Sequence, residues 1–210
     1  MKATELYTYT EIYMGFLFLI LVSFALIFYA ISVCIKLHNK PTAKSFPLKT
    51  TKKMTEEVDK EMGLSYQSLV DYLIQKYGKA KGNYYNQDWT RNKKISRTSQ
   101  GLLIHHIDED KVAGLSSLKK AKYSSYDFQK ADRLVYCNYF EHLLLHIKIA
   151  ESTTVAALGI EGALTIIKEI ERCYINYPKE TWKRNLFRPI ANDSGNFVRI
   201  CNCYEQIKNR

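Results

Sequence analysis

The chain has 210 residues, of which 46% are hydrophobic and 25% charged, and this composition excludes wholesale disorder and collagen-like or low-complexity architectures. Its five cysteines are too few and too scattered for a scaffold held together by disulfides. Lys and Arg outnumber Asp and Glu by 31 to 21, and such an excess of positive charge favours a polyanionic partner, either nucleic acid or an anionic membrane surface.

An uncharged apolar segment near the N-terminus, residues 12–35, predicts a transmembrane helix. About 20 apolar residues are enough to cross a bilayer, and this segment lacks the polar stripe of a soluble helix. Because positive flanks stay on the cytoplasmic side, we expect a single-pass protein of the cell membrane, with residues 1–11 outside and the C-terminal domain in the cytoplasm. The basic flank follows the segment, at Lys36, Lys40, Lys44, Lys49, Lys52 and Lys53.

A cleaved signal peptide is the alternative interpretation of residues 12–35. Signal peptides carry their basic residues before the apolar stretch, whereas here the basic residues follow it and no convincing cleavage site is present. This arrangement favours an uncleaved anchor. Residues 36–55, which are basic and contain two prolines, predict a linker that contacts anionic lipid headgroups.

The next part of the chain predicts one helix and a basic region. Apolar residues recur at helical spacing over 65–77, with Ser65 as the cap and Gly78 as the stop. The basic and aromatic residues of 79–100 are typical of a segment that grips phosphates and stacks on bases, although a solvated loop has the same composition. Together with 179–188, this region supplies the candidate nucleic-acid-binding residues: Lys79, Lys81, Arg91, Lys93, Lys94, Arg97, Lys183 and Arg184.

Two short strands and two helices are predicted further along. Residues 102–104 indicate a strand that ends at a histidine pair, and 134–136 indicate a second strand. Asn138 is expected to cap a helix that continues to about residue 151, and another helix is expected over 153–174. The polar connection between the strands begins with three acidic residues that we expect in a solvated turn: Asp108, Glu109 and Asp110.

Four histidines form two pairs, His105 with His106 and His142 with His146. His142 and His146 lie four residues apart and therefore share one face of the predicted helix. Two imidazoles at that spacing can bind one divalent cation, with a third ligand from elsewhere, and the other pair is the obvious donor. Because neighbouring side chains of a strand point to opposite faces, one member of that pair can bind metal while the other acts on a substrate as a base.

Other interpretations of the histidines stay open. Histidines on the apolar face of a helix are often buried for packing alone, and a structural zinc site is a further alternative, although such sites seldom lack cysteine. A zinc peptidase is disfavoured, since Leu143 stands where that chemistry needs a Glu directly after the first helical histidine.

The segments GLLIHHIDED and RLVYCNYFEHLLLH resemble the HNH endonuclease family, whose ββα-metal fold holds one divalent cation between two short strands and a helix. The resemblance covers residues 101–146. It implies a mainly helical α+β soluble domain over 56–210, with the ββα-metal motif at 101–150. It also implies that the metal ligands are His105, His142 and His146, and that the general base is His106.

Arg133 is the main departure from the family pattern, because it stands where the family has the Asn that orients the base. The resemblance therefore implies that Arg133, or Asp132 beside it, takes this role at the catalytic site. The alternative is a catalytically degenerate module that binds nucleic acid at the membrane without cleaving it.

The implied activity is hydrolysis of DNA phosphodiester bonds by a membrane-anchored endonuclease. The base would remove a proton from the attacking water, for which an imidazole with an ordinary pKa of about 6.5 is suited. One divalent ion, Mg²⁺, Mn²⁺, Ni²⁺ or Zn²⁺, would stabilise the charge on the phosphate. We expect contacts mainly to the DNA backbone, with little sequence preference, and the membrane position fits a role in defence against phage or plasmid DNA.

Overall fold

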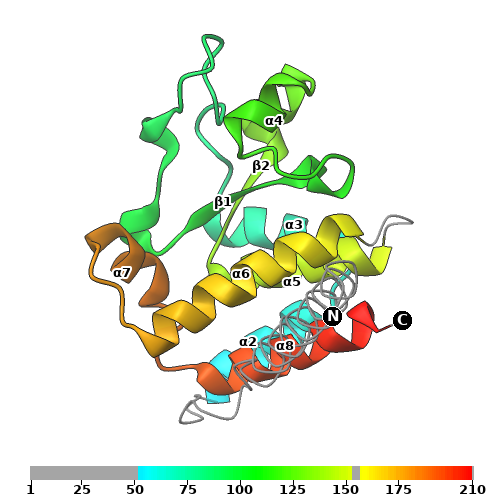
Figure 1. Ribbon diagram of the computed structural model, residues 1–210, viewed down its shortest axis with the longest axis vertical. Helices are drawn as coiled ribbons and strands as arrows, with labels where there is room; N and C mark the ends of the chain where they lie inside the picture. Colours follow the sequence, from blue (N-terminus) through cyan, green and yellow to red (C-terminus); the bar gives the residue numbers. More distant parts are fainter. Residues whose placement is uncertain (1–51, 153–156, 210) are drawn as a thin grey trace, which may run out of the picture. The chain divides into compact units, whose positions relative to one another are not determined.

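Helices make up most of the structure, and one small two-stranded sheet accompanies them (Figure 1). The computed structural model describes residues 52–152 and 157–209, all within one unit of the chain, Phe46–Arg210. This arrangement agrees with the predicted α+β class. The predicted transmembrane segment, 12–35, and the residues before it lie outside the described part, and among the residues described no helix is both long and apolar enough to cross a bilayer.

The first two described helices are α2 (Lys52–Met62) and α3 (Tyr66–Tyr77). Helix α2 begins inside the predicted linker, 36–55, because its charged sequence consists mostly of good helix formers and turns Val58 and Glu61 into the core. Helix α3 has the predicted bounds. Ser65 Oγ accepts the Ser68 N–H at its start, and Gly78, with φ 79°, ends it in a conformation that favours glycine.

The sheet consists of β1 (Leu103–His106) and β2 (Leu134–Cys137), which pair antiparallel. His105 lies opposite Val135 and His106 opposite Leu134, so both histidines belong to the strand instead of following it. The connection between the strands contains four short helical turns: η4 (Ile107–Asp110), α4 (Leu118–Lys122), η5 (Tyr126–Gln129) and η6 (Ala131–Arg133).

Helix α5 (Tyr139–Ser152) is the centre of the fold. Asn138 Oδ1 accepts the N–H groups of Phe140 and Glu141 at 2.8 and 3.0 Å, and Glu141 Oε2 accepts the N–H of Asn138 at 2.6 Å. This reciprocal cap confirms the predicted start of the helix. The body of α5 is almost entirely buried, since the strands and α3 cover one side while α2 and α8 (Ser194–Lys208) cover another (Figure 1).

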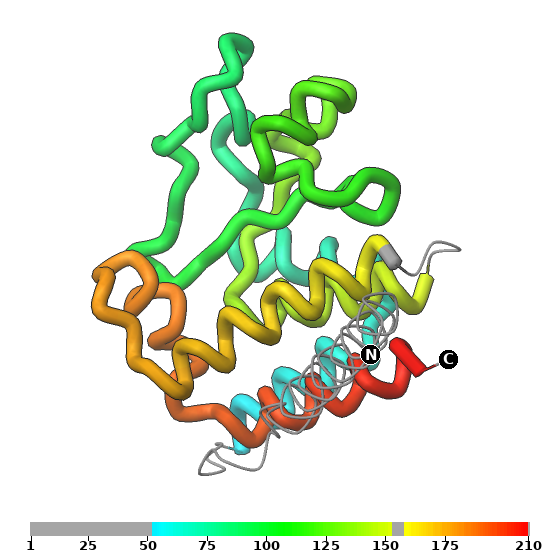
Figure 2. The backbone as a smooth tube through the Cα atoms, viewed as in Figure 1, coloured from blue at the N-terminus to red at the C-terminus, as the bar shows by residue number. Residues whose placement is uncertain are grey.

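Helix α6 (Ala157–Ile175) lies alongside α5 (Figure 2), and α7 (Thr181–Phe187) follows it. Two glycines allow the close approach of α5 and α6. A Cβ atom on Gly159 would lie 2.3 Å from His146 O, and one on Gly162 would lie 2.1 Å from Nδ1 of His146. Helix α5, which carries two of the predicted ligands, thus lies so close to α6 that a residue larger than glycine at position 159 or 162 would clash with it.

A buried ion cluster joins α2, α3 and α5. Lys76 Nζ donates to Glu141 at 2.6 Å and to Glu61 at 3.1 Å, and it also pairs with Glu57. Tyr77 donates its hydroxyl hydrogen to Glu141 at 2.8 Å. Burial, followed by the charge of Glu141, raises the pKa of Glu61 to about 8. The cluster therefore ties the start of α5 to the two helices before the sheet.

Candidate metal centre

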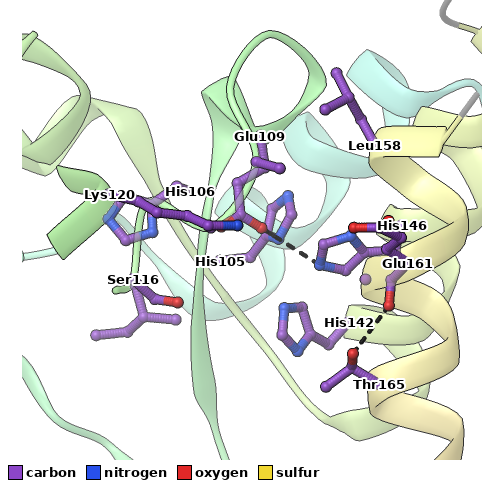
Figure 3. A pocket seen from close by; sticks show the side chains of 14 residues that line it. His105, His106, Glu109, Ser116, Lys120, His142, His146, Leu158, Glu161 and Thr165 are labelled. Carbon is purple, nitrogen blue, oxygen red and sulfur yellow. Dashed lines mark hydrogen bonds and ion pairs between the residues drawn. The ribbon is translucent and has the colours of Figure 1, made fainter. Parts of the chain in front are cut away.

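Three imidazoles meet between β1 and α5 (Figure 3). His105 comes from the strand, and His142 and His146 come from successive turns of the helix. One ring nitrogen of each lies within 4.8 Å of the other two, and the ring centroids are 5.3, 5.1 and 5.0 Å apart. His105 and His146 are buried and His142 is half-buried. These side chains are close enough to hold a metal ion, as their spacing predicted.

Tyr66 fixes the tautomer of His105. Its hydroxyl donates to the carbonyl of Ile107 at 2.7 Å and lies 3.0 Å from His105 Nε2. Because Ile107 takes the hydroxyl hydrogen, the oxygen accepts the Nε2–H of His105, and the lone pair is left on Nδ1. Nδ1 is buried, and none of the described residues hydrogen-bonds to it. A buried lone pair in this position suits a metal ligand, and the hydrogen bond at the far nitrogen is the usual outer support.

Glu109 lies against the same imidazoles and is only 7% exposed. Its Oε1 accepts the N–H of Leu115 at 3.1 Å, while Oε2 lies 3.4 Å from His146 Nε2 and 3.6 Å from His105 Nδ1. Burial raises its pKa to about 7, against the lowering effects of the Leu115 N–H and of the charge of Lys120. The predicted solvated turn is therefore wrong at this position, because η4 packs against α6.

His106 is held by Gln129. Its Nε2 lies 3.1 Å from Gln129 Oε1, and its ring packs against Tyr84 with the centroids 4.4 Å apart. Gln129 donates its own N–H to the Leu115 carbonyl at 3.3 Å, so its oxygen remains to accept the Nε2–H of His106. The lone pair of His106 is therefore on Nδ1. Nothing in the sequence around Gln129 marks this role, which depends on the path of the chain between the strands.

No hydrogen bond or ion pair joins Arg133 or Asp132 to His106, and this corrects the prediction that one of them orients the candidate base. The guanidinium group of Arg133 forms a two-bond ion pair with Asp108, with Nε donating at 2.6 Å. Asp132 is exposed. Asp108 is only 1% exposed, and although burial raises its pKa, the hydrogen bonds from Arg133 and Lys111 bring the pKa below its ordinary value. The turn that was expected in solvent thus buries a second acidic residue.

All four imidazoles of the site are neutral at neutral pH. Burial lowers the pKa of His106 and of His146 to about 4. The pKa values of His105 and His142 are held well below the ordinary value, first by burial and then by neighbouring histidines. Neutral imidazoles are the form that binds a metal ion or accepts a proton.

The four histidines line one cavity of about 270 Å³ (Figure 3). Glu109 and Lys120 line it from the connection between the strands, and residues of α6 close the side beyond α5. Lys120, in α4, is exposed at this cavity. The sequence offered one sign of it, the basic LKKAK of α4, but only the fold brings that segment to the histidines.

The candidate nucleic-acid-binding residues divide into two groups. The first is exposed, with side chains that make no hydrogen bond or ion pair to the described residues: Lys79, Lys81, Lys93 and Lys94. The second makes internal contacts. Arg91 stacks 3.4 Å from the Tyr84 ring centroid, and Lys183 lies 3.8 Å from Glu169. Arg97 donates to the Tyr77 carbonyl at 2.5 Å, and Arg184 donates to the Lys179 carbonyl.

Strand β1 and helix α5 therefore carry the four histidines, with His105 facing the two histidines of α5 and the candidate base, His106, on the opposite face of the strand. The connecting turns add Glu109, Gln129 and Lys120 to the same region. In comparisons with known proteins, no family model, no curated protein and no solved structure matches the chain.

Proposed function

We propose that this protein is a metal-dependent, HNH-type endonuclease that hydrolyses DNA phosphodiester bonds at the cytoplasmic face of the membrane. One observation carries the proposal. Three imidazoles that can hold a cation and a fourth, neutral imidazole with its own positioning partner line the same cavity. A site built only for structural metal has no use for the fourth histidine.

The residues of the cavity suggest a division of roles. His106 Nδ1 takes a proton from water as the water oxygen attacks phosphorus, and the bond to the 3′ oxygen breaks. Gln129 holds the imidazole in the tautomer that this step requires. Lys120, which is exposed and lines the same cavity, would neutralise a phosphate oxygen. A divalent cation held by His105, His142 and His146 would supply electrostatic stabilisation of the charge that develops on the phosphate.

The exposed lysines Lys79, Lys81, Lys93 and Lys94 support contacts with the DNA backbone, because exposed cationic side chains bind phosphate without reading sequence. The side chains of Arg91, Arg97, Lys183 and Arg184 contact other residues of the protein, so their main role is to stabilise the fold. The alternative, a module that binds nucleic acid without cleaving it, was suggested because Arg133 replaces the Asn that orients the base in the family. Gln129 hydrogen-bonds to His106 and could orient it instead, so the replacement by Arg133 no longer favours this alternative.

The test uses the full-length protein in detergent micelles with supercoiled plasmid DNA and a panel of Mg²⁺, Mn²⁺, Ni²⁺ and Zn²⁺. We expect nicking that needs metal and falls by about 10²- to 10⁴-fold in His106→Ala, the usual contribution of a positioned base. His106→Ala should bind metal as the wild type does. His38→Ala, which changes the histidine outside both pairs, is the matched control and should cleave normally.

An intact plasmid under every metal, with folded and metal-loaded protein, would contradict the enzyme proposal. Retardation of the same plasmid in a gel would then support the binding module instead.

A further inference from the structure

We propose that Glu109 is a fourth protein ligand of the metal centre, so that the cation is held by three imidazoles and one carboxylate. The inference rests on the proposed function, because it concerns the same cation. Sequence patterns pointed only to the histidines, and Glu109 stands out through its position in the fold.

The two carboxylate oxygens of Glu109 have different surroundings. Oε1 is bound by the N–H of Leu115 at 3.1 Å, which fixes the carboxylate plane. Oε2 points at the histidines, 3.4 Å from His146 Nε2 and 3.6 Å from His105 Nδ1, as the dashed line in Figure 3 shows for His146. An oxygen at this distance from two candidate ligand nitrogens lies within reach of a cation that both nitrogens share.

The charge of Glu109 also calls for a cation. The side chain is 7% exposed, and among the described residues it forms no ion pair with Lys or Arg. The charge of Lys120 lowers its pKa without direct contact, and its close partners are the Leu115 N–H and neutral imidazoles. Burial of a carboxylate without a compensating charge is strongly unfavourable. Asp108, buried one residue earlier in the same turn, has two cationic partners, Arg133 and Lys111. Asp108 thus has its negative charge balanced by two cationic side chains, and a bound metal ion would balance the charge of Glu109 in the same way.

A fourth ligand has a consequence for metal preference. Four protein ligands complete the tetrahedral shell that Zn²⁺ favours, and a closed shell is typical of structural zinc. Mn²⁺ and Ni²⁺ accept six ligands, so two positions would remain for substrate oxygens. We therefore expect Zn²⁺ to bind tightly and inhibit, while Mn²⁺ or Ni²⁺ supports cleavage.

The test compares metal binding by the wild type with binding by Glu109→Gln, using the full-length protein in micelles. Calorimetry with Mn²⁺ and Ni²⁺ gives affinities, and the visible absorption of Co²⁺ reports the ligands directly. We expect Glu109→Gln to weaken binding by more than about tenfold, since loss of even an outer partner of a ligand costs 10- to 100-fold, and to shift the Co²⁺ bands. The Gln amide oxygen can still accept the Leu115 N–H, so the fold is preserved.

Two variants control the experiment. Glu161→Gln removes a carboxylate that lines the same cavity from α6 and is exposed, and it should leave affinity and spectrum unchanged. Glu109→Asp keeps the charge but withdraws the oxygens, so a ligand role predicts altered Co²⁺ bands, whereas a purely long-range effect of charge predicts none.

Three outcomes would overturn the inference. If Glu109→Gln matches the wild type while His142→Ala loses metal, Glu109 is not a ligand but the histidine centre and the proposed function stand. If Glu109→Asp keeps the wild-type spectrum, the carboxylate acts only through its charge. If the wild type binds none of Mn²⁺, Ni²⁺ and Co²⁺, the inference fails, and the proposed function fails with it when the plasmid also stays intact under every metal of the panel.

Discussion

Single hydrogen bonds determine which nitrogen of each strand histidine is available. Tyr66 takes the Nε2–H of His105, and Gln129 takes the Nε2–H of His106, so the lone pair is on Nδ1 in both. The two residues are consecutive and share a tautomer, yet one faces the imidazoles of α5 and the other faces the connection between the strands. The division of labour in the proposed mechanism thus depends on partners outside β1.

In the proposed mechanism Gln129 positions His106, and its replacement tests that role. In Gln129→Leu the Nε2–H of His106 loses its partner, so the imidazole can turn or change tautomer. We expect kcat for plasmid nicking to fall by about 10- to 100-fold with KM little changed. Gln129→Glu, which can still accept the Nε2–H, should recover part of the rate and move the acidic limb of the pH–rate profile. Equal rates for Gln129→Leu and the wild type would show that His106 needs no such support.

Gly162 controls the position of one candidate ligand. A Cβ added at this residue would lie 2.1 Å from Nδ1 of His146, and under 3.0 Å something must shift. We expect Gly162→Ala to lower metal affinity by more than about tenfold, because the imidazole is displaced or α5 moves from α6. Gly63→Ala is the control, since its nearest neighbour would be 3.5 Å away. Unchanged calorimetric affinity in Gly162→Ala would mean that His146 does not bind the metal through its present position.

At the residue scale, the sequence predicted the members of the site that repeat a spacing and missed those that do not. His105, His106, His142 and His146 stand out because strand alternation and a helical turn are local rules. Glu109, Gln129 and Lys120 lie on the connection between the strands, where no periodicity marks the polar residues that the fold brings to the histidines. Arg133 was misjudged for the same reason, since its partner Asp108 is 25 residues away.

Among the elements, prediction succeeded where caps and periodicity agree. Ser65 with Gly78, and Asn138 with Glu141, delimit α3 and α5 as expected. Helix α2 was missed because its pattern is dominated by charge and its buried face includes Glu61, an acid that the sequence alone assigns to solvent. Its partner, Lys76, belongs to α3, so only the packing of the two helices explains the burial.

The ion cluster of α2, α3 and α5 makes stability depend on pH. Glu61 has a pKa of about 8 in the folded chain against an ordinary value of 4.5, so the unfolded chain loses this proton first. The contribution of protonated Glu61 to the free energy of unfolding is fully present below about pH 4.5, and it is lost as the pH rises towards about 8. We expect Glu61→Gln to become more stable than the wild type over this range, by more than about 1 kcal/mol at pH 8.

Urea unfolding at several pH values measures the difference. Glu56→Gln, on the exposed side of the same helix, is the control for removal of a charge and should shift stability little. A constant difference between wild type and Glu61→Gln from pH 5 to pH 8 would contradict the assignment.

For the whole molecule, the neutral imidazoles predict the opposite pH trend in metal-free protein. His106 and His146 have pKa values of about 4 in the fold, and those of His105 and His142 are also lowered. Their stability contribution is present above about pH 6.5 and is lost as the pH falls towards 4. The raised pKa values of Glu61, Glu109, Asp110 and Glu171 oppose this trend, but only those of Glu61 and Glu109 lie far above the ordinary value, and the four imidazoles outnumber these two carboxyls. We therefore expect the Tm of metal-free protein to fall on acidification from pH 6.5 to 4.5, as followed by circular dichroism.

A cation bound at the site should stabilise the whole unit. At a free concentration 100 times Kd, binding to the folded chain alone contributes about 2.7 kcal/mol, which raises the Tm by roughly 5–10 °C. We expect this rise with Mn²⁺ or Ni²⁺ at pH 7 in the wild type, its reversal by a chelator, and its absence in His142→Ala. A similar rise in His142→Ala would place the ion elsewhere.

The pairing of β1 with β2 places an unusual restriction on how this site can evolve. His105 and His106 are adjacent, and their opposition to Val135 and Leu134 fixes which imidazole faces α5. An insertion or deletion of one residue within β1 would exchange their faces, sending the candidate metal ligand, His105, towards Gln129 and the candidate base, His106, towards α5. Substitutions can therefore change either proposed role alone, whereas a change in the length of this strand removes both in one step.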